Sequence, residues 1–316
     1  MKIIKAGYEH IAIDDPVEKI ERVARVCYKS EDKITEGSAE KMVKSLIKRN
    51  HTAMLEHASL VLEVDIGTYK DIINIINSIA EYYGTNIYLR FSCIDNFIVS
   101  GNMRAWREFV EKCIETHIPI PRNLDVIFKT NKYYIFFEDL DYTVSILGFN
   151  YAVEVDPATL RNAEQLIHRD LSVLFTVDRG VSHEIVRHRV ASFAQESTRY
   201  CNYGKAGDIT VIRPCYFEED TPEMDNWEGS CMWSEQAYLS LLNDGKTPQE
   251  ARAVLPTSVK TELVMTANLR EWMHFFKLRA VGVTGKPHPQ MLEVAVPLLK
   301  DLQNRVPVIF DDLEAR

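Results

Sequence analysis

Residues 171–199 read LSVLFTVDRGVSHEIVRHRVASFAQESTR, and this stretch decides the fold. It begins with an apolar run rich in β-branched side chains, Leu171 to Val177, which predicts a buried strand. A short polar break follows, and Val181 to Val186 is then expected to open a helix. The arginine cluster is therefore predicted to start on a helix that leaves a strand, with Glu184 and Arg187 on one helical face.

The arginine cluster carries the chemistry that this stretch offers. Arg187, Arg189 and Arg199 lie within thirteen residues of a chain whose overall charge is negative. An arginine keeps its proton at working pH and presents a planar fork of donors, so three of them are either solvated or hold a phosphate, carboxylate or enolate-like oxygen. A solvated helix end is the simpler alternative. Interleaved neutral polar residues favour a binding site: Ser192, Gln195, Ser197 and Thr198.

Three motifs, in this order along the chain, resemble the flavin-dependent thymidylate synthases. The first is Glu56-His57-Ala58-Ser59 before a strand-like run from Leu60 to Val64. The second is Arg187-His188-Arg189, followed after seven residues by Ser197-Thr198-Arg199-Tyr200. The third is Leu255-Pro256 followed by Asn268-Leu269-Arg270, His274 and Leu278-Arg279. Three motifs in matching order are far less expected by chance than one.

The resemblance implies reductive methylation of dUMP to dTMP. It implies methylenetetrahydrofolate as carbon donor, FAD as redox carrier and NADPH as reductant. Arginines suit both the nucleotide phosphate and a uracil that becomes more anionic as it is activated. The resemblance also implies a homotetramer with sites built from several subunits and with small molecules as partners.

The resemblance also assigns residues to the two ligands. Contacts with dUMP fall to Glu184, Arg187, Gln195, Glu196, Ser197, Thr198, Arg199, Arg252 and Arg279. Arg279 would be catalytic, because it would polarise the pyrimidine at N3 and O2. Contacts with FAD fall to His57, Ser59, Arg187, His188, Arg189, Gln195, Asn268, Arg270 and His274.

The chain departs from the family pattern at several positions. Residue 184 is Glu where some members have Gln, residue 195 is Gln where some have Glu, and residue 274 is His where Asn is familiar. The first two changes alter charge more than reach. The loop 281–287 is longer than usual, which leaves the role of His288 open.

Other readings of the same residues remain open. Ser197 could be a nucleophile, but no Gly-x-Ser-x-Gly elbow surrounds it. Cys201 could be a thiolate beside cationic groups. At the level of the protein, the alternatives are a phosphate- or nucleic-acid-binding protein without redox chemistry and a flavoprotein with a different acceptor. The colour of the purified protein would distinguish a non-redox binding protein from a flavoprotein. Release of label from C5 of dUMP would distinguish a thymidylate synthase from a flavoprotein with a different acceptor.

Composition agrees with an enzyme of the cytoplasm. The net charge of −9 and the pI near 5.6 argue against a protein that coats nucleic acid or an anionic membrane. Apolar stretches are too short to span a bilayer, and the N-terminus does not read as a signal peptide. The six cysteines lack any Cys-x-x-Cys pair, which predicts buried thiols, not disulfides or zinc. Histidine spacing indicates no metal.

The predicted fold is α/β (α+β), with helices packed on an antiparallel or mixed sheet and no Gly-x-Gly-x-x-Gly fingerprint. We expect one domain over 1–316 with a folded insertion at about 67–162, because His57 and Arg187 lie 130 residues apart. Strands are expected at 2–5, 60–64, 87–100, 171–177, 209–217 and 258–267, with a hairpin at 133–147. Helices are expected at 16–27, 38–48, 69–83, 103–113, from 181 into the arginine cluster, at 224–243, just after Thr247, and at 268–279.

One helical stripe has two interpretations. Asn268, Trp272, Phe275 and Arg279 fall on one face of the helix predicted at 268–279. The two aromatic residues are expected in the core. For Asn268, Arg270 and Arg279 we expect ligand contacts, because burying unpaired polar groups would cost several kcal/mol.

Overall fold

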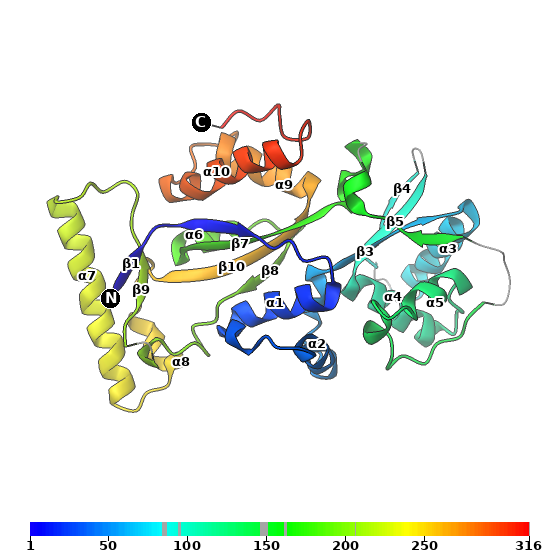
Figure 1. Ribbon diagram of the computed structural model, residues 1–316, viewed down its shortest axis with the longest axis horizontal. Coiled ribbons are helices and arrows are strands. Elements are labelled where there is room, and N and C mark those ends of the chain that lie inside the picture. The colour runs from blue at the N-terminus through cyan, green and yellow to red at the C-terminus, as the bar shows by residue number, and fades with distance from the viewer. Residues whose placement is uncertain (84–86, 94–95, 146–150, 161–162, 206, 316) are drawn as a thin grey trace. The chain divides into compact units, whose positions relative to one another are not determined.

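The structure is a computed structural model that describes residues 1–83, 87–93, 96–145, 151–160, 163–205 and 207–315. The chain forms two compact units. The first unit comprises residues 1–11, 24–31 and 172–316, and the second comprises residues 12–23 and 32–171. Both units combine helices with sheets, as Figure 1 shows, so the predicted α+β class is confirmed.

The first unit is built on a four-stranded sheet in the order β2-β7-β10-β8. Its strands are β2 (Gly7–His10), β7 (Asp170–Asp178), β10 (Lys260–Asn268) and β8 (Ser192–Gln195). β2 pairs antiparallel with β7, and β8 pairs antiparallel with β10. The apolar run of β7 is largely buried, as predicted. A separate parallel pair joins β1 (Lys2–Ile4) to β9 (Thr210–Ile212).

Helices α9 (Leu269–Phe276) and α10 (Pro289–Arg305) cover one face of this sheet (Figure 1). Trp272 and Phe275 of α9 are fully buried, and both rings pack against Phe175 of β7. The aromatic half of the predicted stripe is therefore core, as expected. The other helices are α6 (Arg179–Ile185), α7 (Pro222–Asn243), α8 (Pro248–Ala251) and the last part of α1 (Pro16–Tyr28).

The second unit contains an antiparallel sheet in the order β4-β5-β3-β6. The strands are β4 (Arg90–Ser92), β5 (Phe97–Asn102), β3 (Ser59–Val64) and β6 (Ala152–Glu154). Three helices pack against it: α3 (Ile66–Tyr83), α4 (Met103–Thr116) and α5 (Arg122–Phe128). α2 (Ser38–Lys48) also belongs to this unit. A core of buried aromatic rings joins Trp106 with Phe109 and Phe128.

The hairpin predicted at 133–147 is wrong over its described residues. The segment instead holds a single 3-10 turn, Tyr134–Phe136, and Val144 forms an isolated parallel bridge with Ile120. Tyr133, Phe136 and Phe137 have helical spacing and are all buried, whereas strand alternation would have exposed some of them. Residues 146 and 147 lie outside the described residues. The strand region predicted at 87–100 is two strands, β4 and β5.

The helix predicted to open at Val181 and to carry the start of the arginine cluster begins and ends earlier than expected. α6 begins at Arg179, because the carboxylate of Asp178 accepts the backbone N–H of Val181 at 2.7 Å, and ends at Ile185. The backbone N–H of His188 then donates to the carbonyl of Ile185 at 3.2 Å and closes a turn. The arginine cluster therefore follows the helix, and the expected helical face shared by Glu184 and Arg187 is wrong.

Other expectations differ in detail. The helix predicted at 268–279 begins at Leu269 and gives way to a π-helical turn, Lys277–Val281. α5, β8 and α10 were not predicted, and β9 is shorter than the predicted strand. All six cysteines are free. Cys113, Cys201 and Cys231 are buried as predicted and Cys27 is half-buried, but Cys93 and Cys215 are exposed, so the predicted burial is wrong for those two. Among the described residues, no helix is long and apolar enough to cross a membrane.

Candidate functional site

A pocket of about 820 Å³ in the first unit collects much of the predicted site. It lies between the turn after α6, the helix α9 with its π-helical turn, and the loop before α10. Its basic lining residues are Arg187, His188, Arg189, His274, Arg279, Lys286 and His288, and its acidic ones are Glu184 and Glu271. We call it the arginine pocket. Its excess of cationic side chains suits an anionic ligand.

Arg279 is held firmly at this pocket. Its Nη1 pairs with the Glu184 carboxylate at 2.7 Å, and its Nη2 donates to the Glu184 carbonyl at 3.1 Å. Its Nε donates to Nε2 of His188 at 3.2 Å. Arg279 sits on the π-helical turn, so it departs from the regular path of α9. Glu184, expected to contact a nucleotide, here fixes the guanidinium of Arg279.

His188 is a neutral imidazole. Burial, the positive charge of Arg279 and the nearby His274 lower its pKa to about 4. Because Nε2 accepts from Arg279, the remaining ring proton lies on Nδ1. The ring also packs against Phe275, with ring centroids 5.0 Å apart. His188 thus orients Arg279 without adding a second positive charge.

The guanidiniums of Arg187 and Arg189 are exposed and line the arginine pocket. Within the described parts of the chain, neither one makes a hydrogen bond or an ion pair. Glu184 is committed to Arg279 and does not neutralise them. Two fixed positive charges without a protein partner can therefore meet an anionic group of a ligand.

A second, smaller pocket of about 360 Å³ lies in the same unit. Its polar lining residues are Arg179, His183, Thr198, Arg252 and Thr257. Nη1 of Arg252 donates to the Thr198 hydroxyl at 3.3 Å. Nearby in the sequence, Arg199 donates to Gln249 at 2.8 Å and stacks over Tyr200. Thr198 and Arg252, both predicted to contact the nucleotide, are thus brought together at this second pocket, whose lining residues differ from those of the arginine pocket.

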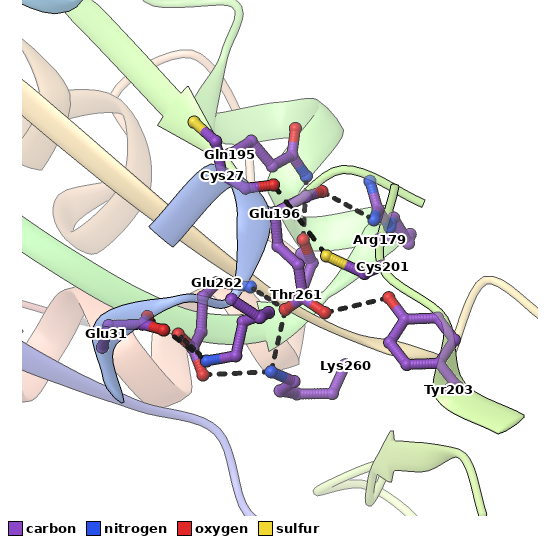
Figure 2. A network of polar contacts seen from close by, with 11 residues as sticks. Cys27, Glu31, Arg179, Gln195, Glu196, Cys201, Tyr203, Lys260, Thr261 and Glu262 are labelled. Carbon is purple, nitrogen blue, oxygen red and sulfur yellow. Dashed lines mark hydrogen bonds and ion pairs between the residues drawn. The ribbon is translucent and has the colours of Figure 1, made fainter. Parts of the chain in front are cut away.

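Glu196 lies in a buried network of charges, which Figure 2 shows. Its side chain is 1% exposed, pairs with Lys260 at 2.8 Å and accepts from the Tyr203 hydroxyl at 2.9 Å. Lys260 also pairs with Glu262 at 3.0 Å, and Glu262 pairs with Lys29 at 2.7 Å. Protein donors thus occupy the carboxylate of Glu196, and its nucleotide contact stays a prediction.

Gln195 and Ser197 flank this network. The Gln195 amide donates to the Ser182 hydroxyl at 2.9 Å and to the Thr261 hydroxyl at 3.2 Å. The Ser197 backbone N–H donates to the Cys27 carbonyl at 3.0 Å, and its hydroxyl accepts the Arg199 N–H at 3.3 Å. Both side chains therefore already have protein partners that fix their orientation.

Cys201 does not have the surroundings of a nucleophile. Burial and the negative charge of Glu196 raise the pKa of its thiol to about 11. The thiol is therefore protonated near neutral pH and reacts slowly. The alternative in which Cys201 is a thiolate nucleophile is not supported by its environment.

The polar residues of the α9 stripe already have structural partners or solvent. The Asn268 side chain caps α9 by accepting the Glu271 N–H at 3.0 Å. Arg270 is exposed, and Arg279 is paired with Glu184. The premise that these groups would be buried without partners is therefore wrong. His274 is exposed and lines the arginine pocket, so it remains available to a ligand.

His57 and Ser59 belong to the second unit. His57 is fully buried at the end of the 3-10 helix Thr52–His57. Ser59 opens β3, and its hydroxyl donates to the carboxylate of Asp170. Asp170 in turn receives two hydrogen bonds from Arg90, at 2.6 and 2.7 Å.

Sequence reasoning missed Arg179, Lys286, Asp170 and Arg90. Arg179 had a local signal, because it lies in the polar break after an apolar strand. Arg90 and Asp170 had none, since the two residues meet only through tertiary folding.

A family model described as thymidylate synthase complementing protein matches residues 10–73 and 161–308. These ranges cover about two-thirds of the chain. The chain belongs to this family. Residues 74–160 lie outside the match, and they include β4, β5, α4 and α5. The expectation of one domain with an insertion at about 67–162 stays a prediction.

Several curated relatives of the chain are named flavin-dependent thymidylate synthase. The protein of Geobacter sulfurreducens is 32% identical over 136 residues, which cover 43% of this chain and 57% of the relative. The protein of Corynebacterium glutamicum is 33% identical over 153 residues, which cover 44% and 59%. The chain thus spans about three-fifths of the length of these relatives.

A solved structure of the UMP/dUMP methylase PolB from Streptomyces cacaoi, bound with 5-Br UMP, also resembles the chain. The similarity covers 98% of this chain and 95% of PolB, with 14% identity and a TM-score of 0.44.

Proposed function

We propose that this protein is a flavin-dependent thymidylate synthase that converts dUMP to dTMP. Methylenetetrahydrofolate would supply the carbon, NADPH the reducing equivalents, and FAD would carry them. The observation that carries the proposal is the arginine pocket, where Arg187 and Arg189 face a ligand space while Glu184 fixes Arg279. Names of the curated relatives support the same activity. We further propose a homotetramer in the cytoplasm, without membrane or nucleic-acid partners.

The residues of the arginine pocket fit FAD. Two exposed guanidiniums match the diphosphate of this cofactor, and the neutral His188 adds a polar ring without extra charge. Arg187, His188, Arg189 and His274 would hold FAD, together with Gln195, Asn268, Arg270, His57 and Ser59. Bound FAD supplies hydride transfer, so neither a serine nor a cysteine needs to attack the pyrimidine.

The nucleotide contacts form a second part of the proposal. Arg199 and Arg252 with Thr198 and Ser197 would bind the phosphate, with Glu184, Arg187, Gln195 and Glu196 as the remaining contacts. Arg279 would place its positive charge at N3 and O2 of the uracil. Because Glu184 and His188 already hold the guanidinium, little reorganisation is needed as the ring becomes anionic.

A combination of spectroscopy and label release tests this function. Purified protein should release FAD on denaturation or bind added FAD with saturation, and its visible spectrum should change with dUMP. With methylenetetrahydrofolate and NADPH, tritium at C5 of dUMP should be released to water. Absence of any flavin binding would favour a non-redox anion-binding protein. Flavin binding without tritium release would indicate a different acceptor.

A further inference from the structure

The carboxylate of Glu271 is the part of the arginine pocket that the proposed function leaves unused. Glu184 and Glu271 are the acidic residues that line this pocket, and Glu184 is paired with Arg279 at 2.7 Å. Within the described residues, the Glu271 carboxylate makes no hydrogen bond or ion pair, although the guanidiniums of Arg187 and Arg189 line the same pocket. The pocket therefore offers a ligand an acceptor as well as cationic donors.

The first turn of α9 fixes the position of Glu271. The backbone N–H of Glu271 donates to the Asn268 side chain that caps the helix, at 3.0 Å. The next residue, Trp272, is fully buried and packs against Phe175 of β7, which fixes the rotation of α9 about its axis. Glu271 and His274, three residues apart, therefore lie on one helical face, and both line the pocket.

A carboxylate in a cationic pocket restricts the ligands that fit. It accepts hydrogen bonds and donates none, so its partner on a ligand is a hydroxyl, an N–H group or a cation. A phosphate gains from Arg187 and Arg189 but is repelled by Glu271. In dinucleotide-binding proteins, an acidic side chain accepts a hydrogen bond from a ribose hydroxyl. Two guanidiniums and one carboxylate thus favour a ligand that carries both phosphates and free sugar hydroxyls.

An acidic residue in the first turn of a helix also has a role that needs no ligand. Its negative charge stabilises the positive end of the helix dipole. Glu223 has the same role in the first turn of α7, is exposed and belongs to the same unit. It lines neither the arginine pocket nor the smaller pocket. Glu223 therefore provides the matched control for Glu271.

We propose that Glu271 is a specificity-determining residue of the arginine pocket: its carboxylate accepts hydrogen bonds from sugar hydroxyls of the flavin dinucleotide, while Arg187 and Arg189 bind the diphosphate. This inference rests on the proposed function, because FAD is assigned to the pocket there. The adenosine ribose and the ribityl chain of FAD both carry such hydroxyls. The carboxylate favours a dinucleotide over a bare diphosphate, which has no hydroxyl to offer.

The test compares two ligands that should respond differently to the loss of this carboxylate. The dissociation constant of FAD is measured by flavin fluorescence on the full chain, and that of inorganic diphosphate by its displacement of FAD. Glu271→Ala should weaken FAD binding by roughly tenfold, the low end for a hydrogen bond to a charged group. Glu271→Gln, whose amide oxygen still accepts, should weaken it less. Both variants should bind diphosphate as tightly as the unchanged protein or more tightly, because a repulsive charge is lost.

Glu223→Ala removes the same charge from a first helical turn and should leave both dissociation constants unchanged. Competition by ADP and by FMN then identifies the sugar. ADP keeps the ribose and lacks the ribityl chain, whereas FMN keeps the ribityl chain and lacks the adenosine ribose. Glu271→Ala should weaken the binding of whichever fragment carries the hydroxyls that Glu271 contacts.

The outcomes separate this inference from the proposed function. Absence of saturable FAD binding by the unchanged protein would refute the proposed function. If the unchanged protein binds FAD and Glu271→Ala binds it equally or more tightly, Glu271 only repels the diphosphate and its specificity role is refuted. Equal weakening of FAD and diphosphate would also refute that role, because it would show a general disturbance of the pocket.

Discussion

The guanidinium of Arg279 helps to set the protonation state of the His188 ring. Arg279 lies 3.2 Å from Nε2 of His188 and contributes to lowering the pKa of that ring to about 4. His188 is consequently neutral at pH 7 and can accept the Arg279 N–H. The one positive charge of the pair stays on Arg279, where the proposed reaction needs it.

Arg279→Ala should therefore change two measurements. The pKa of His188, followed by NMR titration, should rise, because a neighbouring positive charge is removed. Turnover of dUMP should fall by roughly 100- to 1000-fold, as expected for loss of a preorganised donor worth about 3 to 4 kcal/mol. A His188 pKa unchanged from about 4 would show that burial and His274 lower it without a contribution from Arg279.

Cys201 provides a negative test of covalent chemistry. Its thiol pKa of about 11 and its burial predict very slow alkylation by iodoacetamide at pH 7.5, whereas the exposed Cys93 should be labelled readily. Cys201→Ala should keep most of its turnover. Mass spectrometry that found Cys201 labelled first would contradict this environment.

The candidate site could be predicted from the sequence only where its residues belong to motifs with a fixed spacing along the chain. Motif spacing indicated the residues near Arg187 and Arg279, and the structure brings both into the arginine pocket. Motif spacing did not indicate that the Glu184 carboxylate pairs with the Arg279 guanidinium, because the two residues lie 95 positions apart in the sequence. Nor did it indicate that Asn268 caps a helix, since Asn at that position suits a cap and a ligand equally.

At the scale of elements, β10 carries a ladder of alternating charges next to the signature motif. Lys260 lies between Glu196 and Glu262, and Lys29 completes the ladder at the end of α1. Lys29 and Glu262 each experience burial, but their pairing raises the pKa of the lysine and lowers that of the glutamate. The ladder therefore holds the segment around Glu196 in place through ion pairs, of which the pair between Lys260 and Glu196 is the most buried.

Lys260→Met should destabilise the protein by about 3 to 5 kcal/mol, because the carboxylate of Glu196 loses its buried partner. Lys29→Met is the control. Lys29 is 35% exposed, so its loss should cost about 1 kcal/mol or less. Urea unfolding at pH 7 measures both. Equal losses would mean that the burial of Glu196 does not set the cost.

His168 makes the stability of the second unit depend on pH. Its two ring nitrogens contact the hydroxyls of Ser100 at 2.7 Å and Ser92 at 2.9 Å. Burial, with the charge of Arg90, lowers its pKa from 6.5 to about 4. Between these values the unfolded chain binds more protons than the folded one, so stability rises with pH through this window and the contribution is complete above 6.5.

His168→Gln should reduce this pH dependence, because the amide keeps polar contacts but does not titrate. The unfolding free energy of the unchanged protein should fall by up to roughly 3 kcal/mol more than that of the variant between pH 7 and pH 4. Urea titrations at several pH values provide the comparison. Parallel curves would assign the pH dependence to other groups.

Most helices and strands could be predicted, and the failures have a common physical cause. α1, α2, α4 and α7 carry clear apolar periodicity or caps and were found close to their predicted bounds. The prediction for the aromatic segment 133–137 was wrong because the β-propensity of its residues was given more weight than the helical spacing of its buried rings. The predicted end of α6 was wrong because a turn closed by the backbone N–H of His188 ends the helix before the apparent helical pattern does.

At the scale of the whole chain, the unmatched residues 74–160 are joined to the family segments through one sheet. β3 pairs with β5 on one side, Ser59 opposite Asn102, and with β6 on the other, Leu62 opposite Glu154. Both partner strands lie in the unmatched stretch. The family strand β3 thus depends on this stretch for its backbone hydrogen bonds.

Deleting residues 74–160 and closing the gap with a short Gly/Ser linker should therefore prevent cooperative folding. The deletion leaves β3 without either neighbour, although Leu60 and Leu62 are fully buried in the intact unit. Circular dichroism and urea unfolding test this. A soluble deletion variant with a single sharp transition would show instead that the stretch is a separable module.

The π-helical turn at Lys277–Val281 has a consequence for how this family evolves. Such a turn holds one residue more than an α-helical turn over the same rise, and here the Gly282 N–H reaches back five residues to the Lys277 carbonyl at 3.0 Å. In a sequence alignment, the loss of this extra residue would look like a minor one-residue gap. Losing that residue would keep the helix but rotate Arg279 away from Glu184, so a deletion that leaves the hydrophobic pattern intact would still remove the proposed activity.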